Sequence, residues 1–500
     1  MEGSVALPHS RPDRSTRWLA LILVLYALLA GLYAVYTPAW QAPDEPAHYN
    51  YVRYLVEERR LPELRPGDYP VEYLEEIKAA RFPPHMSVDP IRYESHQPPL
   101  YYLLATPAYA LGRALGMQVL LLPLRLFSVL LGIALIATGH AVVRQMWPER
   151  RDLAWGTAAF MATLPMHVAM TAVMNNDVLA ALVLALIVWL LLRAGQQGWT
   201  APRAVWIGLL LGLALLTKLQ AYIAAPLVGL AWLWSASRAH RRGEPLGPLV
   251  GRALLVGGVA LLLVLPWLAR NVSVYGWSDP LAMVRHDEVV VGQLTTQELL
   301  DEIGIVAFMR RLVQTTFQSF WGQFGWMGVL LPARVYQALA ALSALALLGV
   351  VDALPALRTA WRDEAKRYSF LLLGAWGVFT VAGFLWYNIQ YVQHQGRYLF
   401  PALVPLGLLG TFGVQRLLRR RPLWVLGLLA IMATALLLWG FLTEEFRQFT
   451  LVMLAGAMAG IVLGHELEQR APGLPLASLY VGLGGLTLWA LQHMVPLLRP

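Results

Sequence analysis

Two adjacent carboxylates, Asp44 and Glu45, stand between two prolines near the start of the sequence, in the stretch QAPDEPAH at positions 41–48. A proline in the first turn is typical of a helix start, so we expect one of these carboxylates to cap a helix that carries His48 on the same face as Asp44. Like charges held side by side near lipid raise the pKa of one of them. A carboxylate with a raised pKa suits the abstraction of a proton from a hydroxyl group. The alternative is that Asp44 only caps the helix and that Glu45 is solvated.

A second polar stretch contains Glu94, His96 and Gln97 and comes directly before an apolar run. Together with His48, these side chains form a set of carboxylate and imidazole groups able to bind a divalent cation or a phosphate. None of their spacings is specific for a metal ion, so both ligands stay open.

Two further polar groups stand between apolar runs. Asn176 and Asp177 form either the turn that begins the next helix or a hydrogen-bonding group for a polar ligand, and the residue types favour neither. His394, Arg397 and Tyr398 surround Gly396, which would permit a tight turn that exposes Arg397 at the start of the next run.

Three cations, Lys218, Arg270 and Arg397, fall at the expected outer ends of apolar runs, against the bias that places most basic residues at the inner connections. A cavity that binds an anionic phosphate would explain them, because cations at a water-poor boundary pair strongly with phosphate. The alternative for each is a side chain that snorkels to the membrane surface. The aromatic run WGQFGW at positions 321–326 could stack on sugar rings, but we expect it to decorate the membrane interface.

The composition fixes the class of protein that must position these residues. Hydrophobic residues make up 58% of the 500 residues, charged residues 14%, and the mean hydropathy is +0.53. Soluble domains carry about 25% charged residues, so a soluble enzyme, a disordered chain and a fibrous protein are excluded. The 39 basic and 30 acidic residues give a net charge of +9, which we interpret as membrane topology and not as a nucleic-acid site. Because the chain has no Cys, disulfides, iron–sulfur clusters and thiol nucleophiles are excluded as well.

The chain is expected to be an all-α polytopic membrane protein with about thirteen transmembrane helices, each of roughly 20 apolar residues. The expected spans are 17–36, 120–143, 153–173, 178–194, 203–218, 220–236, 252–270, 334–352, 369–388, 398–415, 422–442, 450–464 and 474–494. The run at 98–115 is expected to lie in the outer interface, because counting it as a span would move every later basic loop to the outside.

The basic connections predict a cytoplasmic N-terminus at 1–16 in a cell membrane, an inner or plasma membrane. The transmembrane module of 17–415 then carries two outer segments, 37–118 and 271–333, and further membrane helices follow at 416–500. Apolar residues at helical spacing predict amphipathic surface helices at 51–61 and 71–82.

These features together resemble the GT-C superfamily of membrane glycosyltransferases, and within it bacterial proteins of the protein O-mannosyltransferase and aminoarabinose-transferase type, including uncharacterised members with a DEPAH-like signature. The resemblance covers about residues 15–415 and rests on the order and sidedness of the motifs. They are Asp44 and Glu45 after the first span, QPPLYY at 97–102, Asn176 and Asp177 before a span, and HQGRY at 394–398.

The resemblance implies transfer of a sugar from a polyprenyl-phosphate donor to a lipid, glycan or protein acceptor, through a hydroxyl or an amine, at the extracytoplasmic face. It implies Asp44 as general base with Glu45 in support. Lys218, Arg270 and Arg397 would hold the departing phosphate. The residues implied to line the cavity between them are His48, Glu94, His96, Gln97, Asn176, Asp177, His394 and Tyr398. No clear Asp-X-Asp motif is present, so we expect no essential cofactor, although some GT-C enzymes use a divalent cation.

Two other functions fit a chain with many helices and buried charges. The first is a transporter or flippase of a lipid-linked or anionic substrate, although the sequence lacks two related halves. The second is an assembly protein whose site has decayed. Sequence motifs for phosphate-loop nucleotide hydrolysis, serine hydrolysis and zinc proteolysis are absent.

Overall fold

The chain folds into a bundle of membrane helices with short surface helices at one end. The computed structural model describes residues 14–116 and 120–499, so part of the expected cytoplasmic stretch 1–16 lies outside the described residues. Within them, eleven helical segments are long and apolar enough to cross a membrane, or twelve if a bent pair counts as one span. The eleven contain α1 (Arg14–Tyr36), α5 (Leu121–Met146), α8 (Asp177–Gln197), α10 (Ala224–Arg241), α11 (Gly247–Tyr275), α14 (Ala333–Ala360), α15 (Glu364–Gln390), α16 (Leu403–Arg420), α17 (Leu423–Thr443), α18 (Gln448–Arg470) and α19 (Leu474–His493).

The thirteen expected spans correspond to these eleven segments, the bent pair and one short helix. The bent pair is α6 (Arg151–Thr163) and α7 (Pro165–Thr171), which meet at 68°. Leu164 between them is extended, as expected for a residue before proline. The short helix is α9 (Ala201–Leu215), below the usual length of a span. The polytopic all-α fold is confirmed, and the difference in number comes from α9 and the break at Leu164. The short 3-10 helices η2 (Leu219–Ile223), η3 (Gly396–Ala402) and η4 (Val495–Leu498) adjoin α10, α16 and α19.

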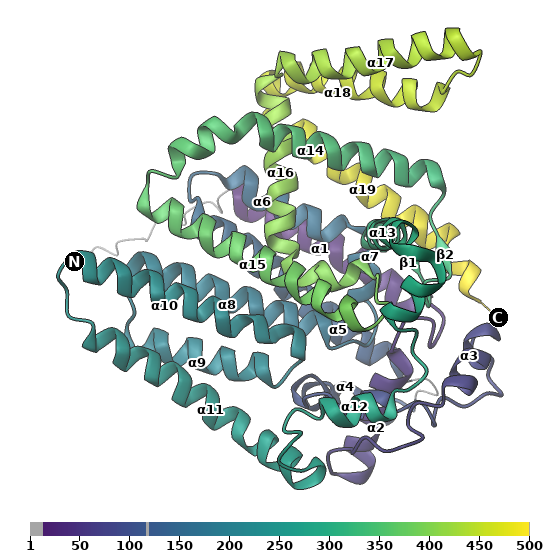
Figure 1. Cartoon of the computed structure of the whole chain (residues 1–500), viewed down its shortest axis with the longest axis vertical. Helices are drawn as coiled ribbons and strands as arrows, with labels where there is room; N and C mark the ends of the chain where they lie inside the picture. Colours follow the sequence, from purple (N-terminus) through teal and green to yellow (C-terminus); the bar gives the residue numbers. More distant parts are fainter. Residues whose placement is uncertain (1–13, 117–119, 500) are drawn as a thin grey trace, which may run out of the picture.

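The two outer segments form the surface helices. The first contains α2 (Glu45–Glu58), α3 (Val71–Ala79), η1 (Tyr93–His96) and α4 (Leu100–Ala114), and the second contains α12 (Met283–Val289), α13 (Thr296–Trp321) and the hairpin of β1 (Gln323–Phe324) and β2 (Val329–Leu330). The predicted helices at 51–61 and 71–82 match α2 and α3, although α2 begins six residues earlier, at Glu45 beside Pro46. In Figure 1, α2, α3, α12 and the hairpin gather at one end of the bundle.

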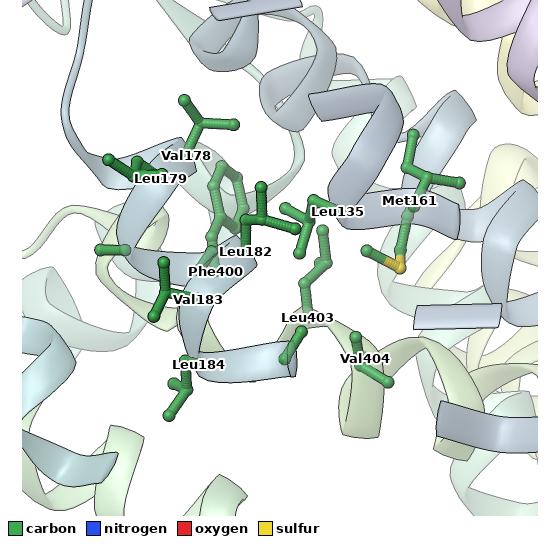
Figure 2. Close-up of a cluster of buried hydrophobic side chains, with 14 of the residues drawn as sticks. Leu135, Met161, Val178, Leu179, Leu182, Val183, Leu184, Phe400, Leu403 and Val404 are labelled. Atoms are coloured by element: carbon green, nitrogen blue, oxygen red, sulfur yellow. The ribbon is translucent and has the colours of Figure 1, made fainter. Parts of the chain in front are cut away.

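Buried apolar side chains from helices far apart in sequence hold the bundle together. Figure 2 shows Leu135 of α5, Met161 of α6 and Leu182 of α8 in one cluster with Phe400 of η3 and Val404 of α16. Among the eleven candidate spans, α8 is the most enclosed, with 78% of its most apolar stretch buried. The connections that carry the polar residues therefore begin at helices with fixed positions.

Two helix pairs approach closely because glycines face their partners. A side chain on Gly208 or Gly212 of α9 would meet Val256 or Leu263 of α11. Gly349 of α14 and Gly413 of α16 also lie against each other's helix backbone. Helices α17 and α18 form a helical hairpin at the edge of the bundle in Figure 1, where Gly464 of α18 lies against Leu418 of α16. Small residues such as these glycines allow membrane helices to pack closely.

Ion pairs join the helix ends that we expect to face the cytoplasm. Arg419 of α16 lies 2.7 Å from Asp152 of α6 and 3.2 Å from Glu468 of α18. Arg238 of α10 lies 3.4 Å from Glu364 of α15. The outer segments follow the other ends of the spans, so basic connections and surface helices belong to opposite ends of the bundle.

Single cysteines test this sidedness, because the chain has none of its own. Ala80 and Glu244 are both exposed, the first after α3 and the second between α10 and α11. In intact cells, an impermeant thiol reagent is expected to label Ala80→Cys and not Glu244→Cys, while both are labelled after cell lysis. Labelling of Glu244→Cys in intact cells would reverse the topology.

Candidate active site

A cavity of about 720 Å³ lies at the end of the bundle that carries the surface helices. Its polar wall comes from the first outer segment, from the connection before η2 and from η3, and its apolar wall comes from α11 and α15. Seven of the residues singled out from sequence line it: Asp44, Glu94, His96, Gln97, Lys218, Arg397 and Tyr398. Residues from widely separated parts of the chain thus meet around one space.

Asp44 occupies the expected N-cap position of α2, but its side chain lines the cavity. Its backbone is left-handed, with φ 68°, and its side chain makes no capping hydrogen bond. Instead, its carboxylate accepts hydrogen bonds from Arg397 Nη2 at 2.6 Å and from the Tyr93 hydroxyl at 2.8 Å. The alternative that Asp44 serves only as a helix cap is therefore wrong.

The pKa of Asp44 is lowered, whereas a raised pKa was expected for one of the two adjacent carboxylates. Burial would raise this pKa, but the Arg397 guanidinium and the hydrogen bonds from Arg397 and Tyr93 outweigh burial and lower it to about 2. The expected pKa rise from a like-charged Glu45 is wrong, because Glu45 faces a cation of its own. Asp44 is therefore an ionised carboxylate that can accept a proton.

Glu45 belongs to a buried ion pair with Arg125 of α5. Arg125 donates hydrogen bonds to both Glu45 carboxylate oxygens, at 2.8 and 2.7 Å, and their side chains are 4% and 0% exposed. Arg125 also donates to the backbone carbonyls of Ala34, Thr37 and Pro38. Neither Glu45 nor Arg125 lines the cavity, so this pair joins α1, α2 and α5 behind Asp44. The signal for Arg125 in the sequence was a charged residue inside an apolar span.

Lys218 forms an ion pair with Asp177 at the beginning of α8. The polar turn before α8 begins that helix, which is one of the two expected alternatives, and a role in binding a polar ligand stays a prediction. Asn175 Oδ1 accepts a hydrogen bond from the Asp177 backbone N–H at 2.7 Å, as in a helix-starting turn. Asn176 Nδ2 donates to Gln97 Oε1 and to the Tyr102 hydroxyl, both at 3.4 Å, and so supports the cavity wall.

Glu94 and His96 line the cavity, and His48 is fully buried outside its lining. The pKa of each of these three groups is shifted so that the neutral form is favoured. Burial and the neighbouring carboxylates Asp44 and Asp177 raise the pKa of Glu94 to about 7. Burial lowers the pKa of His48 and of His96 to about 3, so both imidazoles are neutral. The Glu94 carboxyl group is therefore half-protonated near neutral pH.

The hydrogen bonds of the two histidines fix their rings. His48 Nδ1 lies 2.8 Å from the Tyr102 hydroxyl, and His96 Nδ1 lies 2.9 Å from the Tyr93 carbonyl oxygen. In the described part of the chain, no three His, Asp or Glu side chains are grouped so that they could hold a metal ion.

Arg270 and His394 do not reach the cavity wall. The Arg270 guanidinium lies against the rings of Trp267 and Tyr275 and donates to the Pro62 carbonyl oxygen. His394 packs edge-on against Phe308 of α13, and burial lowers its pKa to about 4. The structure thus brings two of the three candidate phosphate-binding cations together and leaves Arg270 apart.

Gly396 is required for close approach to α13 and not for a left-handed turn. Its φ is not positive, and a side chain there would collide with the backbone of Thr316 and Phe320. The Gly396 N–H donates to Ser319 Oγ at 2.7 Å. This contact sets the position of Arg397, whose Nε and Nη1 are buried without a hydrogen-bond partner.

Several lining residues were not predicted from sequence. Trp267, Phe384 and Trp386, from membrane helices α11 and α15, form part of the apolar wall, and Tyr69 and Trp326 come from the outer segments. Trp326 belongs to the aromatic run at 321–326, which was the signal that could have identified it. The cavity accordingly joins an ionic region with an apolar region next to the membrane.

Comparison with known proteins identifies the fold. The model of a family described as predicted membrane proteins (DUF2142) matches residues 85–406, and no curated protein sequence matches. Solved structures of ArnT from Cupriavidus metallidurans are similar in the apo state (19% identity, 97% of this chain and 78% of ArnT covered, TM-score 0.55) and bound to undecaprenyl phosphate (18%, 96% and 77%, TM-score 0.54). An oligosaccharyltransferase from Archaeoglobus fulgidus has 15% identity over 93% of this chain and 55% of its own, with a TM-score of 0.49. ArnT is a GT-C glycosyltransferase, so the expected GT-C fold is confirmed.

Proposed function

Because this chain belongs to the DUF2142 family of predicted membrane proteins and has the GT-C fold, we propose that it transfers a sugar from a polyprenyl-phosphate donor to an acceptor hydroxyl or amine at the extracytoplasmic face of the membrane. The observation that carries this proposal is the shared cavity of Asp44, Lys218 and Arg397 beside apolar membrane helices. The ArnT structure bound to undecaprenyl phosphate supports the class of donor.

The apolar and the charged regions of the cavity match the lipid chain and the phosphate of such a donor. The apolar wall from Trp267, Phe384 and Trp386 adjoins the lipid-facing helices α11 and α15, where a polyprenyl chain could enter. The phosphate would lie at Lys218 and Arg397, because buried cations bind phosphate oxygens with short, charge-assisted hydrogen bonds. The sugar would then project toward Asp44.

The reaction is a displacement at the anomeric carbon. The acceptor oxygen or nitrogen attacks that carbon, its proton passes to the Asp44 carboxylate, and the bond between the anomeric carbon and the phosphate oxygen breaks. The electron pair of the broken bond leaves on the phosphate, where Lys218 and Arg397 stabilise the added negative charge. No residue needs to form a covalent intermediate in this scheme.

Each cation is paired with a carboxylate before a donor binds. Arg397 holds Asp44, and Lys218 holds Asp177. A phosphate that takes over Arg397 would weaken its contact with Asp44, and the pKa of Asp44 would rise toward its ordinary value. Donor binding would in this way convert Asp44 from an ion-pair partner into a stronger base, so the donor is expected to bind before the acceptor reacts.

Removing one cation tests the donor site. Lys218→Gln is expected to weaken binding of undecaprenyl phosphate about 10- to 100-fold, because a hydrogen bond to a charged group is lost. Binding can be measured by native mass spectrometry or microscale thermophoresis in detergent. Arg334→Gln is the matched control, since Arg334 is an exposed cation at the outer end of α14. The affinity of this variant for undecaprenyl phosphate is expected to stay within about twofold of the wild-type value. Equal losses in both variants would contradict a specific phosphate site.

Phosphate binding is also expected to depend on Glu94. Its pKa of about 7 means that the carboxyl group is neutral below this pH and negatively charged above it. Raising the pH from 6 to 8.5 should therefore weaken the binding of undecaprenyl phosphate to the wild-type protein. This loss of affinity should exceed the loss in Glu94→Gln by a factor on the order of ten. The comparison with Glu94→Gln removes the titration of the phosphate itself. Parallel pH profiles of the two proteins would rule out this role of Glu94.

A further inference from the structure

The end of the cavity away from the membrane helices carries aromatic side chains that the proposed reaction does not use. Tyr69 and Trp326 line this end, and Tyr93 connects them to the reacting centre. The Tyr93 hydroxyl donates to Asp44, while its ring packs edge-to-face with Tyr69 at 5.4 Å between centroids. An aromatic wall therefore leads outward from the candidate base.

Trp326 is held in one orientation by its neighbours. Its indole N–H donates to the Trp40 carbonyl oxygen at 3.0 Å, and its ring stacks on Phe82 with 5.9 Å between centroids and 19° between planes. The Lys78 ammonium lies 5.2 Å from the ring centroid. Trp326 is only partly buried, and a tryptophan held in this way loses little conformational entropy when a ligand binds.

Polar groups surround this aromatic surface. Lys78 pairs with Glu75 at 2.6 Å, and both residues line the cavity. Gln293, also in the lining, has a buried Oε1 atom without a hydrogen-bond partner. A buried carbonyl oxygen without a donor is costly, so Gln293 indicates a ligand that supplies a hydroxyl or amine group.

We propose that Trp326, Tyr69, Glu75, Lys78 and Gln293 form a subsite for a pyranose ring of the acceptor, which makes the acceptor a glycan or glycolipid. The C–H face of the ring stacks on Trp326, and its hydroxyl groups pair with Gln293 Oε1, the Glu75 carboxylate and the Lys78 ammonium. This assignment rests on the proposed function, since it needs the donor sugar and phosphate to occupy the Asp44, Lys218 and Arg397 end. The nucleophile of the acceptor then lies between the aromatic surface and Asp44.

Saturation-transfer difference NMR on the full-length protein in nanodiscs tests the subsite with methyl glycosides of glucose, mannose, galactose and N-acetylglucosamine. At least one glycoside is expected to receive saturation through its ring C–H protons. This signal should fall about fivefold or more in Trp326→Ala and be kept in Trp326→Phe, which retains an aromatic face. Trp277→Ala is the control, because Trp277 is 89% exposed and lies outside the cavity lining, and it should leave the signal unchanged.

Binding of the donor lipids separates this proposal from the proposed function. Trp326→Ala should bind undecaprenyl phosphate and undecaprenyl-phosphate glucose as tightly as the wild-type protein. A weaker affinity for the sugar-bearing lipid alone would assign Trp326 to the donor sugar and overturn the acceptor subsite. The absence of saturation for every glycoside, or equal saturation in Trp326→Ala and wild type, would overturn it as well, with the donor site intact. Failure of the wild-type protein to bind either lipid would instead contradict the proposed function.

Discussion

Replacing Asp44 with asparagine is expected to lower the rate of sugar transfer about 10²- to 10⁴-fold, the usual contribution of a general base. Asparagine is the appropriate replacement because Asp44 has a left-handed backbone, which asparagine tolerates better than alanine does. The assay supplies purified protein to membranes from cells that lack it and follows a radiolabelled sugar from its polyprenyl-phosphate carrier into product.

The same variant separates catalysis from donor binding. Without the Asp44 carboxylate, Arg397 keeps its charge and loses its anionic partner. Asp44→Asn is therefore expected to bind undecaprenyl phosphate at least as tightly as the wild-type protein while transfer is lost. Transfer at more than about a third of the wild-type rate would end the assignment of Asp44 as base. Loss of lipid binding together with activity would indicate that Asp44 holds the site in shape.

Replacing Arg125 with methionine is expected to destabilise the fold by about 3–5 kcal/mol, since it leaves the Glu45 carboxylate buried without a partner. Glu45 is fully buried, and Arg125 additionally satisfies three backbone carbonyls where α1 leads into the first outer segment. Thermal unfolding of the detergent-solubilised protein, followed by its loss from a monodisperse chromatography peak, measures this effect.

The double variant Arg125→Met with Glu45→Gln is the matched control for that ion pair. It removes both charges, so it should recover part of the stability that Arg125→Met loses. Asp352 and Arg416, paired at 2.6 Å and more exposed, give a comparison at the other end of the bundle. Arg416→Met should cost less than Arg125→Met, and equal losses would show that the burial of Glu45 is not what makes the Arg125 pair important.

The arrangement of the site could be predicted from the sequence to the extent that it depends on depth in the membrane. Counting apolar runs and basic connections assigns Asp44, Lys218 and Arg397 to the same side of the membrane. The structure places all three around one cavity. The count also kept α4 out of the set of spans. A helix that crosses lipid must satisfy its own backbone hydrogen bonds and have a length that matches the bilayer. This part of the fold can therefore be predicted from the local composition of the sequence.

The direction in which a side chain points from its helix, and the partner that it finds far away in the sequence, could not be predicted in this way. The end of α11 sets the depth of Arg270, but neighbours such as Tyr275 hold its side chain away from the cavity wall. The pKa of one of the two carboxylates Asp44 and Glu45 was predicted to rise because they are adjacent in sequence, but the pKa of Asp44 is lowered. The contact that decides the shift comes from Arg397, 353 positions away. Likewise, the apolar span around Arg125 gave no indication that Glu45 is its partner.

Electron cryo-microscopy of the protein in nanodiscs with undecaprenyl phosphate tests the central claim most directly. We expect density for the lipid phosphate in contact with Lys218 and Arg397, with its chain along the apolar wall near Trp267 and the Asp44 carboxylate displaced from Arg397. A phosphate bound instead at the basic connections near Arg238 and Arg241, or a cavity left unchanged at saturating lipid, would contradict the proposal that this cavity is a donor site.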